Sequence, residues 1–487
     1  MSRLRCSILA ASLFVPIPGL EAQVLIDTLA LRAHTYFLSH DRLVGRGTGT
    51  EGATVAALYI ASQCRAFGLA SVSPQYAQPI ELEEVTISAD TKLAATRLGR
   101  TVKFDYASDF VTYLGGGASP GPIAGPAVFV GAGNQISEAR LTHVPLKGTV
   151  AVTLGVLTSI ESADLLHAKG AVGIVQLMSD ERTYSLHRLS LDDTGLYNAD
   201  PTVKSSFGPP IPLIIAAPSL HRLLATVPLT SENQLPLGPL GWHLSLEIAA
   251  HRRSRTAENV ACLLPGLDPA ARDTVVAFSA HYDHLGVGPP DSSGDSIYNG
   301  FSDNAAGVAV LLAVAQAMAR DSTHTLRESA LFLFFVGEER GLLGSDFYVA
   351  HPLWPLDRTK AVINIDAGAP PGPPVSWRLA GVDSTGLGAA AISVARKRDW
   401  HVTTSPPRAN SDYYPFVREG VPGVSVVPGP NPFEGLTADS SEALRKRWGH
   451  YHHPADEWAE VFPFGGLKRY GEYAYLIARA VDSVPLR

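Results

Sequence analysis

The second half of the chain alternates short apolar runs with longer amphipathic segments. Residues 275–280 (VVAFSA), 329–336 (SALFLFFV) and 361–365 are apolar at consecutive positions, which is typical of strands buried on both faces. Residues 305–320 (AAGVAVLLAVAQAMAR) predict a long helix between two of these strands. This alternation predicts an α/β fold with a mostly parallel central sheet flanked by helices.

The first half of the chain has a different pattern. A helix is predicted at residues 54–67, preceded by a Gly-rich turn at 41–52 (DRLVGRGTGTEG). The Gly- and Pro-rich stretch 115–125 is typical of a linker, and short β-branched runs follow it. We therefore expect a small α/β module at residues 118–245, inserted between the two parts of the main domain, residues 23–117 and 246–487.

The first 22 residues have the plan of a signal peptide. Arg3 and Arg5 precede an apolar run at residues 7–15, and Ala22 offers a cleavage site. We expect an exported protein, periplasmic or secreted, with no integral membrane segment after cleavage, because no other run approaches about 18 apolar residues. Cys64 and Cys262 would remain in the mature chain, where one disulfide is possible but not deducible from sequence.

Composition excludes one class of partner. Apolar residues make up 46% of the chain and charged residues 17%, which suits a globular protein with a large core. The formal net charge is −7. No clustered Lys/Arg surface is visible in the sequence, so we expect no nucleic-acid partner.

Candidate metal ligands cluster where the predicted strands end. In open α/β sheets, ligands bind beyond the carboxyl ends of the strands. Asp303 lies just before the long helix, and the remaining candidates follow apolar strands or lie in the segment GHYHHPADEW (449–458). The set is His281, Asp283, Asp303, Glu338, Glu339, Asp366 and His452. Each of them alone is more often a cap or a satisfied polar group than a ligand.

The residue types favour zinc. Imidazole and carboxylate ligands without a thiolate suit Zn²⁺. Five ligands, which are His281, Asp303, Glu339, Asp366 and His452, exceed the three protein ligands of one open catalytic zinc. Two Zn²⁺ per chain that share one carboxylate fit this set better.

Six ordered motifs carry a resemblance to a known family. They are AHYDHLG (280–286), NGFSDNAAG (299–307), GEERGLLGS (337–345), INIDAGA (363–369), NSDYYPF (410–416) and YHHPAD (451–456). Together with residues 38–69, they resemble the co-catalytic di-zinc exopeptidases, which include bacterial leucyl aminopeptidases and glutamate carboxypeptidases. The resemblance covers most of residues 30–480 and implies the zinc exopeptidase fold.

The resemblance also implies a role for each residue of the set. His281 and Asp366 would bind one zinc, Glu339 and His452 the other, and Asp303 would bridge them. Glu338 would be the general base, Asp283 would fix the orientation of His281, and Asp456 would do the same for His452. Tyr451 would stabilise the oxyanion.

Some positions depart from the family pattern, and the insert has a resemblance of its own. Ala367 stands where the family often has Met, Tyr413 where it commonly has His, and His453 follows the last ligand, where Thr or Ser is usual. Residues 146–177 and 211–217 resemble a protease-associated domain, which would either border the active-site cleft or be a passive insert.

These features predict an exported zinc aminopeptidase that acts on peptides through a metal-bridged hydroxide. A carboxypeptidase or dipeptidase on the same metal core is the main alternative, with Arg408 as the partner of the substrate carboxylate. A single-zinc glutaminyl cyclase and an inactive binding protein of the same fold are further alternatives. The sequence leaves the oligomeric state open.

Overall fold

The computed structural model describes residues 26–117, 122–190, 194–209, 211–224, 236–366, 368–382 and 386–482. The predicted signal peptide, residues 1–22, and Ala367 lie outside these ranges.

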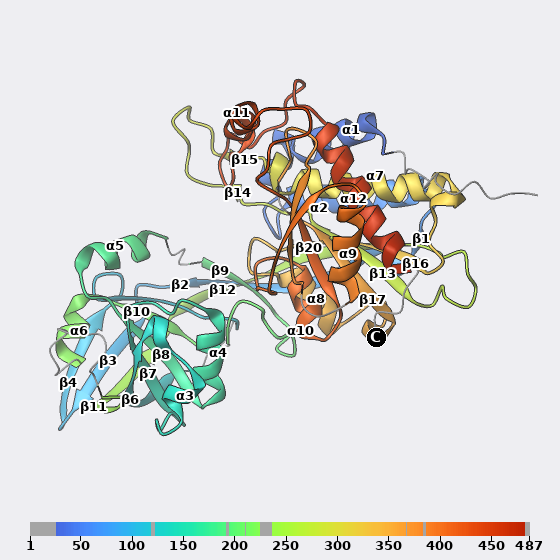
Figure 1. Ribbon diagram of the computed structural model, residues 1–487. Coiled ribbons are helices and arrows are strands. Elements are labelled where there is room, and N and C mark those ends of the chain that lie inside the picture. Colours follow the sequence, from blue (N-terminus) through green and yellow to red (C-terminus); the bar gives the residue numbers. More distant parts are fainter. Residues whose placement is uncertain are drawn as a thin grey trace, which may run out of the picture.

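The main domain is built on a ten-stranded mixed sheet (Figure 1). Its order is β19 (His401–Ser405), β18 (Ser376–Ala380), β20 (Gly423–Pro428), β17 (Thr359–Ile365), β13 (Val275–His281), β16 (Ser329–Phe335), β12 (Ala250–Leu264), β2 (Ala77–Ile87) and β9 (Thr194–Asn198), with β1 (Ala70–Ser71) paired to β12.

The predicted α/β fold is confirmed, but the sheet is parallel mainly at its centre. Strands β16, β13, β17 and β20 are parallel neighbours, whereas β12, β2 and β9 continue the sheet antiparallel. The reason is visible along β2, where buried and exposed positions alternate over much of the strand. Such one-sided burial is typical of antiparallel strands, while the central strands are buried on both faces.

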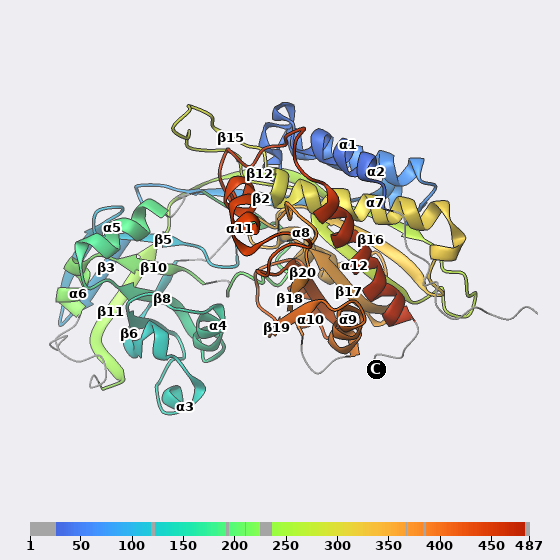
Figure 2. The ribbon, with the colours of Figure 1, turned by 45° about the horizontal axis from the view of Figure 1, so that its top comes forward.

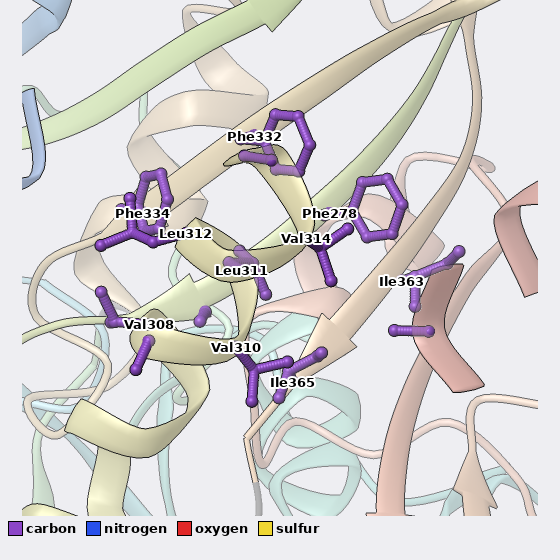
Figure 3. Packing of buried hydrophobic residues seen from close by; sticks show 14 of the residues in the cluster. Phe278, Val308, Val310, Leu311, Leu312, Val314, Phe332, Phe334, Ile363 and Ile365 are labelled. Carbon is purple, nitrogen blue, oxygen red and sulfur yellow. The ribbon is translucent and has the colours of Figure 1, made fainter. Parts of the chain in front are cut away.

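Helices cover both faces of the main sheet. One face packs against α7 (Ala306–Arg320) and α12 (Gly465–Asp482), and Figure 2 shows α1 (Thr28–Leu38) and α2 (Glu51–Ala66) beside α7. The other face packs against α8 (Leu343–Ala350) and α10 (Tyr413–Arg418). Phe332 and Phe334 of β16 lie toward α7 (Figure 3), and the alternate residues Leu331 and Phe335 join the cluster beneath α8 and α10.

Two further helices complete the main domain, and a disulfide ties its first half to the sheet. Helix α9 (Gly386–Arg396) packs against α12, and α11 (Ala438–Trp448) precedes the segment with His452. A disulfide joins Cys64 in α2 to Cys262 in β12.

The helix at residues Phe301–Arg320, which contains α7, is long and apolar enough to cross a membrane by length and composition. In its most apolar window 83% of the residues are buried inside the protein. Val308, Val310 and Leu311 contribute to the core that α7 forms with the sheet (Figure 3). Packing within this core therefore accounts for the apolar composition of the helix.

A second sheet with its own helices forms a separate lobe (Figure 1). Its order is β4 (Arg100–Asp105), β3 (Lys92–Arg97), β11 (Gly238–Glu247), β6 (Ile123–Ala132), β7 (Thr149–Leu154), β8 (Ala171–Leu177), β10 (Leu213–Ala216) and β5 (Phe110–Tyr113). The helices of this lobe are α3 (Glu138–Leu141), α4 (Ile160–Ala168), α5 (Glu181–Ser190) and α6 (Pro218–Leu224).

The second lobe begins earlier in the chain than the predicted insert at 118–245. Strands β3, β4 and β5, which precede residue 118, pair within the second sheet, whereas β9 pairs with β2 in the main sheet. The Gly-rich stretch 115–125 has the composition of a linker between domains. It follows β5 and leads into β6, so it connects two strands of one sheet.

Candidate metal centre

The predicted ligands lie at one edge of the main sheet because three adjacent parallel strands end there. His281 is the last residue of β13, Asp366 directly follows β17, and Glu338 follows β16 by three residues. Gly337, with φ +79°, turns the chain after β16 in a conformation that favours glycine. The sequence pattern had predicted this arrangement at the carboxyl ends of the strands.

Asp303 is supplied by the turn before α7 and is held there by Asp456. The carboxylate of Asp456 accepts hydrogen bonds from Ser302 N at 3.0 Å and from Asp303 N at 3.1 Å. Burial raises the pKa of Asp456 to about 7. Asp456 therefore positions Asp303, whereas the sequence analysis had assigned it to His452.

The two oxygens of Asp303 face two different histidines. Oδ1 lies 3.2 Å from His281 Nε2, which is also 3.2 Å from Asp366 Oδ1. Oδ2 lies 3.2 Å from His452 Nε2, which is also 3.2 Å from Glu339 Oε2. The five predicted ligands thus form two groups of three donor atoms, with Asp303 common to both.

The spacing of these atoms fits zinc. Ligand atoms about 2.0–2.1 Å from a tetrahedral ion lie roughly 3.3 Å from one another. The contacts of 3.2 Å within each group match that separation. Imidazole nitrogen and carboxylate oxygen are also the donors that zinc accepts when no thiolate is present.

The electrostatics of the site favour positive charge between the carboxylates. Hydrogen bonds to Asp303 and Glu339 raise the pKa of His452 to about 10. Burial opposes protonation of His281, yet Asp366 and Glu338 raise its pKa well above the usual range. Buried carboxylates at this density need cationic partners, and metal ions bound by the same atoms would supply that charge.

His281 faces Asp283, the residue to which the resemblance assigns the orientation of this ligand. The Nδ1 atom of His281 lies 3.2 Å from Asp283 O and 3.7 Å from Asp283 Oδ1. The Asp283 carboxylate is fully buried and accepts hydrogen bonds from Thr48 Oγ1 at 2.6 Å and from Glu338 N at 3.3 Å. Thr48 belongs to the Gly-rich turn, to which the sequence analysis had assigned no chemistry.

A chain of hydrogen bonds that begins in β13 holds the carboxylate of Asp366. Ser279 Oγ donates to Asn364 Oδ1 at 2.7 Å, and Asn364 Nδ2 donates to Ser411 Oγ at 2.6 Å. Ser411 Oγ in turn donates to Asp366 Oδ2. Ser411 lies in the motif NSDYYPF, so this motif acts by orienting a ligand.

His284 is a residue of the site that the sequence analysis missed. Its side chain is buried, and Nδ1 donates a hydrogen bond to Glu339 Oε1 at 2.6 Å. His284 also lies 4.0 Å from Asp303 Oδ2, so it could belong to a ligand group with Asp303 and Glu339. The distances favour His452 as the ligand and His284 as the residue that orients Glu339. Its place in AHYDHLG, three residues after His281, was the available signal.

The segment after α11 places His452, and not His453, at the centre. His453 is exposed, and its Nδ1 accepts a hydrogen bond from Ala455 N at 3.1 Å. The ring of Tyr451 stacks on the ring of His452 at a centroid distance of 3.8 Å. Desolvation and the carboxylates of Asp303 and Glu339 raise the pKa of Tyr451 well above its usual range, so its hydroxyl remains a donor.

Two other positions noted in the sequence do not contribute to the centre as expected. The hydroxyl of Tyr413 accepts a hydrogen bond from Arg408 N at 3.0 Å, so it holds the 408–410 loop. The side chain of Arg408 is exposed and lies outside the lining of the adjoining pocket, whereas Arg340 and Arg418 belong to that lining. Arg408, the expected partner of a substrate carboxylate in a carboxypeptidase, therefore lies away from the pocket lining.

A pocket of ≈ 950 Å³ adjoins the centre and lies between the two lobes. Glu338, Glu339 and His452 line it from the main domain, and Tyr113 and Asp164 line it from the second lobe. This volume lies in the usual range for a ligand site.

Comparisons with known proteins match the part of the chain that carries this centre. Residues 259–477 match peptidase family M28. The chain is 27% identical over 220 residues to a probable leucine aminopeptidase 2 of Aspergillus oryzae, an alignment that covers 42% of this chain and 39% of that protein. It is 27% identical over 270 residues to a probable leucine aminopeptidase 2 of Aspergillus fumigatus, an alignment that covers 50% of this chain and 48% of that protein. The chain thus spans less than half the length of each of these relatives.

The fold also matches a solved structure over nearly the whole chain. The aminopeptidase from Aneurinibacillus sp. strain AM-1 superposes with a TM-score of 0.54 and 17% sequence identity, covering 93% of each chain. This likeness supports the fold, while the matched family segment contains all five predicted zinc ligands. Residues 259–477, slightly less than half of the chain, therefore match peptidase family M28, in agreement with the resemblance of the six motifs to the di-zinc exopeptidases.

Proposed function

We propose that this protein is an exported aminopeptidase that removes N-terminal residues from peptides and holds two zinc ions per chain. The observation that carries the proposal is the position of Asp303, whose two carboxylate oxygens each lie 3.2 Å from a different histidine. A carboxylate shared in this way is the arrangement expected between two metal ions. A single-zinc centre, as in a glutaminyl cyclase, would leave one of the two groups of donor atoms without a metal ion.

Recognition of a free α-amine suits the chemistry of this centre. An ammonium or amine group needs carboxylate or carbonyl partners, and Glu338 and Glu339 line the pocket beside the metal ligands. The two fungal relatives are described as probable leucine aminopeptidases, which supports recognition of the N-terminal end of the substrate. We therefore assign aminopeptidase activity in preference to carboxypeptidase or dipeptidase activity.

Glu338 is the residue placed to move a proton. When bound, zinc polarises the scissile carbonyl and lowers the pKa of water. Glu338 would accept a proton from the attacking water and donate it to the leaving amine. Burial raises the pKa of Glu338 well above its usual range, with His281 opposing and the Asp366 carboxylate adding to it. The positive charge of bound zinc would lower this pKa and leave Glu338 ionised, as a base requires.

Tyr451 would donate a hydrogen bond to the oxygen that becomes negatively charged. Its side chain is 74% exposed, and its stacking on His452 keeps the ring next to a ligand. A protonated hydroxyl here would strengthen its interaction as charge develops on the substrate. Loss of this donor should therefore lower kcat more than it raises KM.

Export and the identity of the second lobe complete the proposal. The disulfide between Cys64 and Cys262 supports an oxidising compartment, in line with the signal-peptide pattern of residues 1–22. We assign the second lobe as a protease-associated domain that borders the pocket, which its contribution to the pocket lining supports.

Zinc titration of the chelator-treated protein tests the proposal. We expect wild-type protein to bind two equivalents of zinc and to regain hydrolysis of leucine p-nitroanilide. Asp303→Ala should lose both ions, and Glu338→Gln should bind both without regaining turnover. One tightly bound zinc with no effect of a second would contradict the two-metal centre, and full activity without metal would contradict the whole proposal.

A further inference from the structure

A segment that connects the main sheet to the second sheet lies along α8, the helix that follows the turn with Glu338 and Glu339. This segment, residues 199–209, follows β9 and leads toward β10, and we call it the strap. Next to its start, Asn198 Nδ2 donates to Leu343 O at 3.1 Å. Asp200 Oδ2 lies 2.8 Å from His351 Nε2 at the end of α8.

The strongest attachment of the strap is a buried carboxylate. Asp346 in α8 is 1% exposed, and its two oxygens accept hydrogen bonds from Ser206 N and Ser206 Oγ, both at 2.6 Å. Arg418 joins the same cluster, 3.2 Å from Asp346 Oδ1 and 2.9 Å from Ser206 Oγ. Buried charged hydrogen bonds of this kind hold a loop in one position.

The residue next to Ser206 is an exposed aromatic. Phe207 is 58% exposed and lines the pocket together with Glu338 and Glu339. It lies against the backbone of Gly341, because a Cβ at Gly341 would be 3.2 Å from the Cβ of Phe207. Gly341 is two residues after Glu339, so Phe207 is fixed beside the candidate metal centre.

An exposed phenylalanine on a surface needs no special explanation. Phe207 differs because it faces a pocket next to ligand residues and because its neighbour is held by a buried carboxylate. An aromatic side chain on a rigid loop binds apolar groups at a low cost in conformational entropy.

We propose that Phe207 is a specificity-determining residue that contacts an apolar side chain beyond the cleaved residue of a peptide, and that Asp346 positions it through Ser206. This proposal rests on the aminopeptidase function proposed above. With the N-terminal residue at the metal centre, the rest of the peptide must continue along the pocket, which strap residues line together with Tyr113 and Asp164.

The test compares one N-terminal residue with and without a following chain. Leucinamide has no residue after the cleaved leucine. Leu-Gly-Gly has a glycine at that position, and Leu-Leu-Gly has an apolar side chain there. For Phe207→Ala we expect kcat/KM for Leu-Leu-Gly to fall about 10-fold through KM, in the range of losing one apolar contact. The value for leucinamide should change less than about 2-fold, and Phe207→Tyr should retain most of the preference.

Variants of the attachment separate positioning from folding. Ser206→Ala removes the hydroxyl shared by Asp346 and Arg418 and should produce the pattern of Phe207→Ala, with a smaller loss on Leu-Leu-Gly. Thr202→Ala is the matched control, because the Thr202 hydroxyl donates a hydrogen bond within the strap, to Asp200 at 2.7 Å, and Thr202 lies outside the pocket lining. It should leave all three substrates unchanged.

Equal losses on leucinamide and Leu-Leu-Gly, or no loss on either, would contradict the role of Phe207. A wild-type protein that cleaves none of the three substrates would instead contradict the proposed aminopeptidase function. The two failures are therefore distinguishable.

Discussion

His284 donates a hydrogen bond from Nδ1 to Oε1 of Glu339 over 2.6 Å, while the other oxygen of Glu339 lies 3.2 Å from His452 Nε2. This pairing leaves one oxygen of Glu339 for a metal ion and fixes its direction. Residues that orient a metal ligand typically change metal affinity or activity about 10–100-fold when removed.

We predict that His284→Ala weakens one of two zinc sites about 10–100-fold and leaves the other site nearly unchanged. Zinc binding measured by competition with a chromogenic chelator should then resolve one tight and one weakened equivalent. Asp283→Asn is the matched variant, because Asp283 contacts His281. It should weaken the site formed by His281, Asp303 and Asp366, and not the site that contains Glu339. Equal affinities of both sites in His284→Ala would contradict this role.

Glu338→Gln should lower kcat about 10²–10⁴-fold, because the amide cannot accept the proton that the carboxylate accepts. The fold and the zinc content should remain, since Glu338 lies outside the two ligand groups that share Asp303. Steady-state kinetics together with metal analysis of the same preparation provide the measurement. Near-normal turnover would remove Glu338 from its proposed role.

The disulfide should contribute measurably to stability. Replacing both Cys64 and Cys262 by Ala removes a cross-link between residues 198 positions apart, and native disulfides typically stabilise by about 2–4 kcal/mol. We expect a lower melting temperature than that of wild type, and reduction of wild-type protein should lower it in the same direction. If the double variant has the same melting temperature as oxidised wild type, the cross-link is either not formed or not stabilising.

His34 should make stability fall at acidic pH. Its side chain is 4% exposed, and burial lowers its pKa to about 4, with Asp27 opposing. Below pH 6.5 the unfolded chain binds a proton at His34 that the folded protein binds only near pH 4, so stability falls as the pH falls through this window. The shift corresponds to roughly 3 kcal/mol.

His34→Asn should remove this part of the pH dependence, since Asn can retain a bond to Tyr59, whose hydroxyl lies 2.9 Å from His34 Nδ1. Melting temperatures at pH 4.5 and pH 7 should differ less in this variant than in wild type. His143→Asn, at an exposed position, is the control and should melt like wild type at both pH values. Identical pH dependence in His34→Asn and wild type would contradict the assignment.

The sheet edge and the position of the candidate ligands could be predicted from the sequence because both depend on local pattern. Apolar strands followed at once by His281 and Asp366 place those side chains where parallel strands end. Contacts between distant segments have no such local signal. The bond from Thr48 to Asp283 joins residues 235 positions apart, and that from Ser206 to Asp346 joins residues 140 apart.

The boundary of the second lobe was missed for a related reason. Strand β5 (Phe110–Tyr113) pairs with β10 (Leu213–Ala216), about a hundred residues later, and the Gly-rich stretch between β5 and β6 has the composition of a linker. Pairing partners of edge strands depend on the assembled sheet and are not encoded in the strand itself.

Blocking each end of a short peptide tests the central claim, recognition of a free N-terminus, most directly. The rate of cleavage of Leu-Gly-Gly should fall by several orders of magnitude when its N-terminus is acetylated, because the groups that bind the amine are left unpaired. Amidation of its C-terminus should change the rate little. Loss of cleavage on amidation, with the acetylated peptide still cleaved, would contradict the account and indicate a carboxypeptidase, in which Arg340 and Arg418 of the pocket lining would be the residues to mutate first.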